Sequence, residues 1–149
     1  MIKKNIEIKK KITNTMMRNG DKKTVEKIIK KSFKLLQKQN NKNYLNIVKH
    51  SIINSTPIFK INVQSKKRGK RKVKKEIPTF INKNILRIVA SFNFLSENAL
   101  KNKDLNCFYQ KITKEIIDSS LQKSRSIEQK NEIQKQVLLQ KRYLLNFRW

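Results

Sequence analysis

The sequence predicts a mainly α fold: a single bundle of about six helices with one protruding β-hairpin. Apolar residues recur at helical spacing along most of the 149 residues. The chain contains only two glycines and two prolines, which favours long helices joined by few tight turns. One stretch alternates apolar with polar residues instead, as a strand does. Because this length suits one domain, we expect residues 1–149 to form a single domain, with the hairpin at about residues 58–78.

Three helices are predicted before the hairpin. The first covers about Ile6–Arg18, and Asn19-Gly20-Asp21 then supplies a turn and an N-cap for a second helix over Thr24–Gln37. A third helix covers Asn43–Asn54 and ends before Pro57, since proline interrupts helical hydrogen bonding. The positions that set the helical period are Ile8, Ile12, Met16, Val25, Ile28, Ile29, Ser32, Leu35, Leu36, Leu45, Val48, Ser51 and Ile52.

After Pro57 the period changes from that of a helix to that of a strand. Phe59, Ile61 and Val63 alternate with polar residues, and Val73–Ile77 provides a partner strand. Between them lies KKRGKRK, with Gly69 available for the turn. An apolar core does not accept such a charged tip, so we expect it to project into solvent or onto a ligand.

Helical spacing resumes after Pro78 and predicts three further helices. Their apolar positions are Ile85, Ile88, Val89, Phe92 and Leu95 in the first, Leu105, Phe108, Ile112 and Ile116 in the second, and Ile133, Val137, Leu138, Leu144 and Leu145 in the third. The chain shows no internal repeat, no heptad seam long enough for a coiled coil and no low-complexity linker.

The chain is strongly cationic along its whole length. A total of 37 Lys and Arg residues against 10 Asp and Glu gives a formal net charge of +27. Self-repulsion of this size opposes folding unless a polyanion neutralises it, so we expect the isolated protein to be marginally stable. Nucleic acid is the expected partner, because each neutralised phosphate releases condensed counterions. An anionic membrane surface is the competing partner, although no apolar run approaches the ~18 residues of a membrane span.

The densest cationic stretch is QSKKRGKRKVKKEIP, at the predicted hairpin tip and its return strand. It is either a solvated loop or a phosphate-binding surface. If about six of its cations engage phosphates, the slope of log affinity against log salt should contain roughly −4 to −5 from the hairpin alone. RNA shape and single-stranded loops are the expected targets, because A-form major grooves exclude side chains. The candidate RNA-binding residues are Lys66, Lys67, Arg68, Lys70, Arg71, Lys72, Lys74, Lys75, Lys3, Lys4, Lys9, Lys10, Lys11, Lys22, Lys23, Arg142, Arg148 and Trp149.

Two groups of terminal residues keep alternative interpretations open. The N-terminal lysines either contact RNA or form a frayed basic end. Tyr143, Phe147 and Trp149 either stack on bases or pack at a helix end.

The chain has few side chains that could act in catalysis or bind a metal. Cys107 is the only cysteine, which excludes an intramolecular disulfide, and with His50 as the only histidine there are too few soft ligands for zinc. A lone cysteine inside an apolar pattern is typical of a small core residue, and we expect His50 to be inert on a polar helix face. The carboxylates are scattered, without a catalytic pair, a triad or a Gly-rich phosphate loop nearby. We therefore expect a protein that is not an enzyme and needs no cofactor or metal.

Three local stretches, in this order, resemble a known family. ITNTMMRNGDKKTVEKIIKKSF, residues 12–33, is similar to that family's short helix, N/D-G-K-K turn and A-E-K-I-V helix. The segment from NSTP through QSKKRGKRKVKKEIP is similar to its N-V-x-P, V-x-S-R-R-x-G-G and V-P hairpin, and RYLLNFRW is similar to its R-x-F-A-H-Y-R-W ending. On these motifs the chain, from Ile12 to Trp149, resembles the universal small-subunit ribosomal protein seven family.

The resemblance implies a helical domain that binds the 3′ major domain of small-subunit rRNA and helps to nucleate assembly of the subunit head among neighbouring head proteins. It also implies that the hairpin extends toward the exit-site tRNA and the mRNA path. Ser65, Lys67 and Gly69 would lie in the hairpin motif, with Pro57 before its first strand and Pro78 after its second. The terminal motif would comprise Arg142, Tyr143, Phe147, Arg148 and Trp149.

The sequence departs from the family pattern at two positions. Lys70 replaces the second glycine of the hairpin, and Lys135 stands where the family has a histidine, so no role of that histidine transfers. Because the sequence ends at Trp149, we expect the contacts of the longer bacterial tail to be absent or made by another protein.

The amino-acid composition indicates the cellular compartment in which the protein is made. Richness in Lys, Asn and Ile, with only Ala90 and Ala99 for alanine, indicates an AT-rich genome. The N-terminus resembles neither a secretory signal nor a typical transit peptide. We therefore expect a mitochondrial, organelle-encoded ribosomal protein, with a plastid or the bacterial cytoplasm as alternatives.

Two other classes of protein fit a basic helical chain. A DNA-compacting nucleoid protein would bind duplex DNA about as well as rRNA. A membrane-surface protein would concentrate lysines along one helix face opposite a continuous apolar stripe, whereas here the lysines are spread around the helices.

Overall fold

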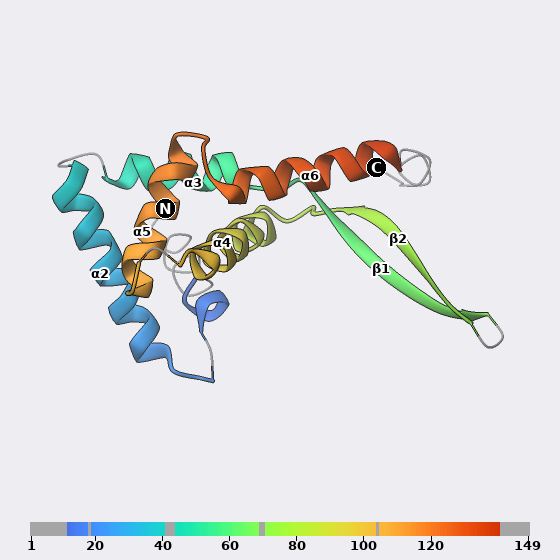
Figure 1. The fold of residues 1–149 in the computed structure, drawn as a ribbon, viewed down its shortest axis with the longest axis horizontal. Helices are drawn as coiled ribbons and strands as arrows, with labels where there is room; N and C mark the ends of the chain where they lie inside the picture. The colour runs from blue at the N-terminus through green and yellow to red at the C-terminus, as the bar shows by residue number, and fades with distance from the viewer. Residues whose placement is uncertain (1–11, 18, 41–43, 69–70, 104, 141–149) are drawn as a thin grey trace.

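The computed structural model describes residues 12–17, 19–40, 44–68, 71–103 and 105–140. Within them, a group of packed helices carries one β-hairpin that extends away from the helical body (Figure 1). This confirms the mainly α class with a single protruding hairpin. A helical segment at residues 12–16 is followed by α2 (Lys22–Asn40), α3 (Tyr44–Ser55), β1 (Phe59–Arg68), β2 (Arg71–Phe80), α4 (Asn84–Lys101), α5 (Phe108–Ser120) and α6 (Arg125–Leu139).

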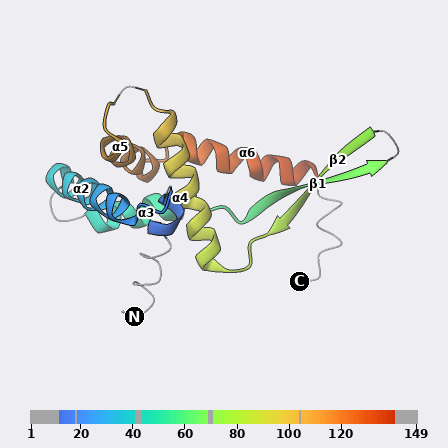
Figure 2. The ribbon, with the colours of Figure 1, turned by 90° about the horizontal axis from the view of Figure 1, so that it is seen from below.

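The helical body is organised around α5, which lies against α2, α3 and α4 (Figure 2). The core cluster joins Leu36 of α2 and Ala99 of α4 to Ile112 and Ile116 of α5. Leu36, Ile112 and Ile116 were predicted from helical spacing, because a period of 3.6 residues places them on one face of each helix. Ala99 was not among the predicted positions, although it lies four residues after Leu95 on the same face of α4. Partly buried side chains, among them that of Phe33, close the edges of the cluster.

Buried hydroxyl groups bring the helices close together around this core. Ser55 of α3 and Ser91 of α4 are both fully buried and share a hydrogen bond of 2.9 Å between their Oγ atoms. Ser119 Oγ of α5 donates to the Ser51 carbonyl of α3 over 3.2 Å, and Ser32 Oγ of α2 lies 3.3 Å from the Tyr109 carbonyl of α5. Such small side chains allow close helix contact while the carbonyl acceptors satisfy buried polar atoms.

The turn before α2 matches the N-cap predicted from the sequence. Asn19 and Gly20 adopt positive φ angles of 52° and 80°. The carboxylate of Asp21 then accepts hydrogen bonds from Thr24 N (3.3 Å) and Thr24 Oγ1 (2.5 Å). These bonds stabilise the ionised form, and they lower the pKa of Asp21 from its usual 3.8. Asp21 therefore satisfies an amide that the first turn of the helix leaves unpaired.

The root of the hairpin is closed by contacts between its own two strands, and the strands are longer than predicted. The Phe59 and Phe80 rings pack with centroids 4.4 Å apart, and Ile81 N donates to the Ile58 carbonyl over 3.0 Å. Pro78 was expected after the second strand, but it lies inside β2, opposite Ile61. A hairpin tolerates proline there because each of its two strands has an open edge, where a missing N–H costs no ladder bond.

Some predicted apolar positions do not join the core. Leu45 is 58% exposed and Leu138 is also exposed, because α3 and α6 turn those positions away from the helices they contact. Leu105 precedes α5 instead of lying within it, since that helix begins at Phe108. The predicted first helix is seen as a helical segment at residues 12–16, and its earlier part lies outside the described residues, as do Leu144 and Leu145.

Candidate nucleic-acid interface

The hairpin has two faces whose composition changes along its length. The register pairs Phe59 with Phe80, Ile61 with Pro78 and Val63 with Glu76 on one face, so this face is apolar near the root. Further out, on the same face, the pairs become Ser65 with Lys74 and Lys67 with Lys72. Residues on one face of a strand recur every second position, so apolar residues give way to cations over about four residue pairs.

The distal strands place like charges opposite each other. Lys67 pairs with Lys72 and Arg68 with Arg71, and like charges directly opposite on an antiparallel pair are destabilising. Glu76 is the only carboxylate in either strand, and it lies nearer the root. By sequence, neither strand therefore contains a carboxylate beyond Glu76, toward the end of the arm that lies furthest from the body (Figure 1).

The predicted binding residues of the hairpin are placed to different extents. Lys74 and Lys75 of β2 have exposed side chains, as phosphate contact requires. The backbone register includes the positions Lys66, Lys67, Arg68, Arg71 and Lys72, while their side chains and the whole of Lys70 lie outside the described residues.

Of the other predicted binding residues, the two that the structure describes are not brought to the hairpin. Lys22 and Lys23 are exposed at the start of α2, which both views place on the far side of the body from the hairpin (Figures 1 and 2). Lys22 Nζ lies 3.9 Å from Glu26 Oε1, one turn along the same helix. Outside the described residues lie Lys3, Lys4, Lys9, Lys10, Lys11, Arg142, Arg148 and Trp149.

The base of the hairpin also contacts α6, so the arm and the helical body are linked at two places. β1 lies against α6. Arg87, in the first turn of α4, donates through Nε to the Ile81 carbonyl just beyond β2, over 2.7 Å. These contacts fix the direction in which the arm leaves the body.

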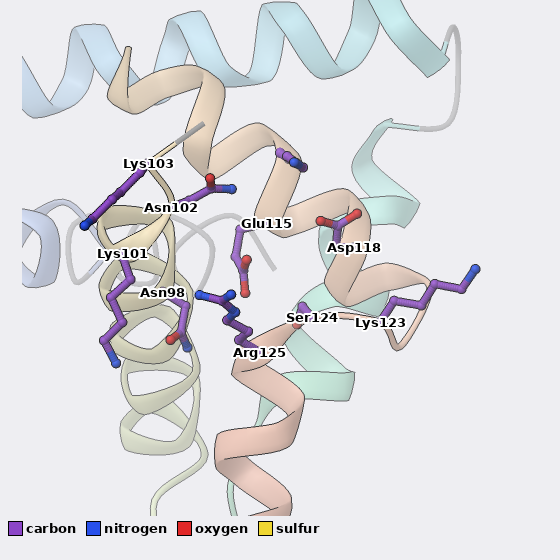
Figure 3. Close-up of a pocket in the computed structure, with 10 residues that line it drawn as sticks. Asn98, Lys101, Asn102, Lys103, Glu115, Asp118, Lys123, Ser124 and Arg125 are labelled. Atoms are coloured by element: carbon purple, nitrogen blue, oxygen red, sulfur yellow. The ribbon is translucent and has the colours of Figure 1, made fainter. Parts of the chain in front are cut away.

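A cationic pocket between helices was missed by the sequence analysis. It lies between α4, α5 and the start of α6 and has a volume of about 490 Å³ (Figure 3). Its cations come from three different segments, all within residues 101–125, which meet only when α4, α5 and α6 pack together. No single local motif therefore predicts it, and the one weak signal is the Lys-Ser-Arg run at residues 123–125. The cationic residues that line it are Lys101, Lys103, Lys114, Lys123 and Arg125.

One cation has a structural position inside the body. Lys130 Nζ of α6 donates to the Asn54 carbonyl near the end of α3 over 2.6 Å. Partial burial disfavours the charged ammonium and lowers the pKa of Lys130 below its usual 10.5. A cation at the C-terminal end of a helix also complements the helix dipole. Lys130 therefore joins α6 to α3, and it is not counted among the interface residues.

Cys107 and His50 lie at the surface. His50 is exposed on α3, as expected for a polar face. The prediction that Cys107 is a small core residue was wrong, because its side chain is exposed. The reason is that α5 begins one residue later, which leaves Cys107 in the connection and not on the buried face of the helix.

Among the residues that the structure describes, no three His, Cys, Asp or Glu side chains gather closely enough to hold a metal ion. Within the same part of the chain, no helix has the length and apolar character needed to cross a bilayer.

Comparison with known proteins identifies what this architecture is similar to. A family model described as "Ribosomal protein S7p/S5e" matches residues 2–141. "Small ribosomal subunit protein uS7c" of Euglena longa is 29% identical over 122 residues, which cover 82% of this chain and 66% of that protein, slightly under two thirds. "Small ribosomal subunit protein uS7m" of Reclinomonas americana is 24% identical over 139 residues, covering 93% of this chain and 83% of that protein.

Proposed function

Because the chain belongs to the ribosomal protein S7p/S5e family, whose members are structural proteins of the ribosome, we propose that it is a constituent of the small subunit that binds folded rRNA. The relatives named above are small-subunit proteins by name, and the family match covers nearly the whole chain. The work of such a protein is to neutralise phosphates and to hold RNA segments together. No catalytic step is part of the proposal.

The pairing of like charges along the distal hairpin carries this proposal. Lys67 opposite Lys72 and Arg68 opposite Arg71 make the isolated arm unfavourable. A polyanion that lies along the arm turns this repulsion into attraction and gains counterion release as well. The arm is electrostatically unfavourable in isolation and is stabilised when a phosphate backbone lies along it.

The finer assignments follow the family resemblance. We propose that residues 1–149 act as one RNA-binding domain, which binds the 3′ major domain of small-subunit rRNA and helps to nucleate head assembly among neighbouring head proteins. The hairpin then reaches toward the exit-site tRNA and the mRNA. Relatives from a chloroplast and a mitochondrion support an organellar ribosome, and the AT-rich composition favours a mitochondrial, organelle-encoded protein.

Competition binding tests the proposed function. The full-length protein is bound to an RNA containing the 3′ major domain at moderate salt, and random duplex DNA is added as the competitor. We expect the RNA to be retained against a large excess of duplex, because rRNA shape adds to the phosphate attraction. Equal affinity for the two would contradict the proposal and favour a DNA-compacting protein.

A second measurement tests the proposal that the hairpin reaches the exit-site tRNA and the mRNA. Neutralising its tip with Lys70→Gln, Arg71→Gln and Lys72→Gln should weaken tRNA or mRNA occupancy in reconstituted subunits more than it weakens head assembly. Lys34→Gln with Lys38→Gln and Lys49→Gln removes the same charge from exposed positions on α2 and α3 and serves as the control. Subunits that lose their heads while tRNA binding stays unchanged would overturn this assignment.

A further inference from the structure

A second cationic site lies away from the hairpin, at the pocket between the end of α4, the side of α5 and the start of α6 (Figure 3). It is referred to below as the α6-terminus pocket. Lys101 and Lys103 approach it from the end of α4, and Lys123 and Arg125 from the connection into α6. All four side chains are exposed, so they can meet a ligand without a burial cost.

The connection between α5 and α6 holds two of these cations in place. Gln122 adopts a positive φ of 61°, and Lys123 N donates to the Asp118 carbonyl over 2.9 Å, which closes the end of α5. This is a helix C-terminal turn of the Schellman type. The turn places Lys123, Ser124 and Arg125 in the lining of the pocket.

The first turn of α6 forms one wall of the pocket and attracts anions. Ser124 occupies the N-cap position with extended backbone angles of φ −91° and ψ 152°, yet its side chain makes no capping hydrogen bond. Ser124 is only 3% exposed, and its Oγ has no hydrogen-bond partner among the described residues. A helix N-terminus favours negative charge, and the unpartnered buried hydroxyl is a separate indication that a polar ligand belongs there.

The carboxylates of the pocket restrict the charge of that ligand. Glu115 is buried and accepts from Ser126 Oγ over 2.6 Å and from Ser126 N over 3.4 Å, so it is already bound to the inner side of the α6 terminus. Asp118 adds a second carboxylate to the lining. The described lining still has more cations than carboxylates, five against two. This surplus makes the pocket attractive to an anion such as a phosphodiester.

We propose that the α6-terminus pocket binds a phosphodiester group of the RNA backbone, as a second RNA contact separate from the hairpin. This inference rests on the proposed function. α6 begins at the pocket and runs toward the hairpin side of the body, so its 15 residues, on the order of 20 Å, separate the two contacts (Figures 1 and 2). The body then joins two separate segments of RNA instead of one continuous stretch.

Pairwise charge removal tests the pocket in the full-length protein. Lys123→Gln with Arg125→Gln removes the two cations at the start of α6, and Lys101→Gln with Lys103→Gln removes the two cations at the end of α4. Lys34→Gln with Lys38→Gln on α2 is the matched control. Affinity for RNA containing the 3′ major domain is measured at several salt concentrations, and thermal unfolding checks that each variant is folded. Each pocket pair should reduce the slope of log affinity against log salt by about 0.7–0.9 more than the control does.

The outcomes separate this inference from the proposed function. If wild-type protein prefers the rRNA to random duplex while both pocket pairs match the control, the pocket is not an RNA contact and the proposed function stands. If wild-type protein shows no such preference, the proposed function fails, whatever the pocket variants do. Inorganic phosphate at constant ionic strength should narrow the difference between wild type and pocket variants, because it competes with the RNA phosphodiester for the same cations. Phosphate binding to the wild-type pocket, together with pocket variants that match the control in RNA affinity, would assign the pocket to free phosphate and overturn the assignment to the RNA backbone.

Discussion

The helical body and the hairpin are stabilised by different means. The body buries Leu36, Leu95 and Ile116 and closes its helix contacts with hydroxyl bonds such as that between Ser55 and Ser91. The hairpin packs at its root through Phe59 and Phe80, and beyond that its described part pairs mainly with itself. The body therefore contains the interactions that determine its shape, whereas the described part of the arm is held mainly by pairing between its own two strands.

Removal of a core side chain should break the body and have the largest effect. Leu36 is 0% exposed and lies in the cluster that joins α2 to α4 and α5. Leu36→Ala is expected to lower the free energy of unfolding by about 2–5 kcal/mol, through lost apolar burial and the cavity left behind. Urea unfolding followed by circular dichroism measures it.

Leu139→Ala provides the matched control for this substitution. Leu139 is 86% exposed at the end of α6, so the same change there should alter the free energy of unfolding by no more than about 0.5 kcal/mol. Equal losses at the two positions would show that the cluster around Leu36 is not the centre of the body.

Neutralising the arm should affect binding and leave folding unchanged. Lys74→Gln with Lys75→Gln removes two exposed cations from β2. If both contact phosphates, the slope of log affinity against log salt should fall by about 1.4–1.8, which is roughly 25-fold to 60-fold weaker binding at 0.1 M salt. Filter binding gives the slope, and urea unfolding should show an unchanged midpoint. A variant that unfolds at a lower urea concentration but binds with the wild-type slope would show that Lys74 and Lys75 stabilise the fold and do not contact RNA.

The sequence predicted those features of both regions that depend on neighbouring residues. Helical spacing placed Leu36, Ile112 and Ile116 on buried faces, and strand alternation located the hairpin to within a few residues at each end. The Asp21 cap was also predictable, because a cap and the amide it accepts from lie three residues apart.

Features that depend on how separate helices pack together could not be predicted in this way. The α6-terminus pocket combines α4, α5 and α6, and the bond between Ser55 and Ser91 joins positions 36 residues apart. A pattern of spacing marks Ser51 as facing the core, but it does not show which helix its carbonyl will meet. Cys107 illustrates the same limit, because its exposure depends on where α5 begins, and helix boundaries shift by a residue or two.

Enlarging a small contact residue should separate two helices of the body. Ser91 of α4 is fully buried against Ser55 of α3. Ser91→Val removes the shared hydrogen bond and adds volume where the helices approach, so we expect a loss of about 1–3 kcal/mol in the free energy of unfolding. Ser96→Val changes a less buried serine of the same helix and should cost less, about 0.5 kcal/mol. Similar losses at both positions would indicate that the close approach of α3 and α4 does not depend on Ser91.

The smallest expected effect concerns the cap of α2 and depends on pH. The two hydrogen bonds from Thr24 lower the pKa of Asp21 below 3.8, so the ionised cap contributes stability that is fully present above pH 3.8. This contribution is lost as the pH falls through the lower pKa of the folded state. Asp21→Asn keeps a capping oxygen but cannot titrate, and it removes a negative charge beside Lys22 and Lys23 at the start of the helix.

Wild type should therefore exceed Asp21→Asn in urea midpoint at pH 6, and the gap should close as the pH falls below 3.8. Glu132→Gln removes an exposed carboxylate from α6 and controls for the loss of one negative charge. A gap between wild type and Asp21→Asn that stays constant over this range would mean that the carboxylate of Asp21 does not stabilise α2 through its charge. The RNA-binding slope of Asp21→Asn should match that of wild type, because the cap belongs to the body and not to the arm.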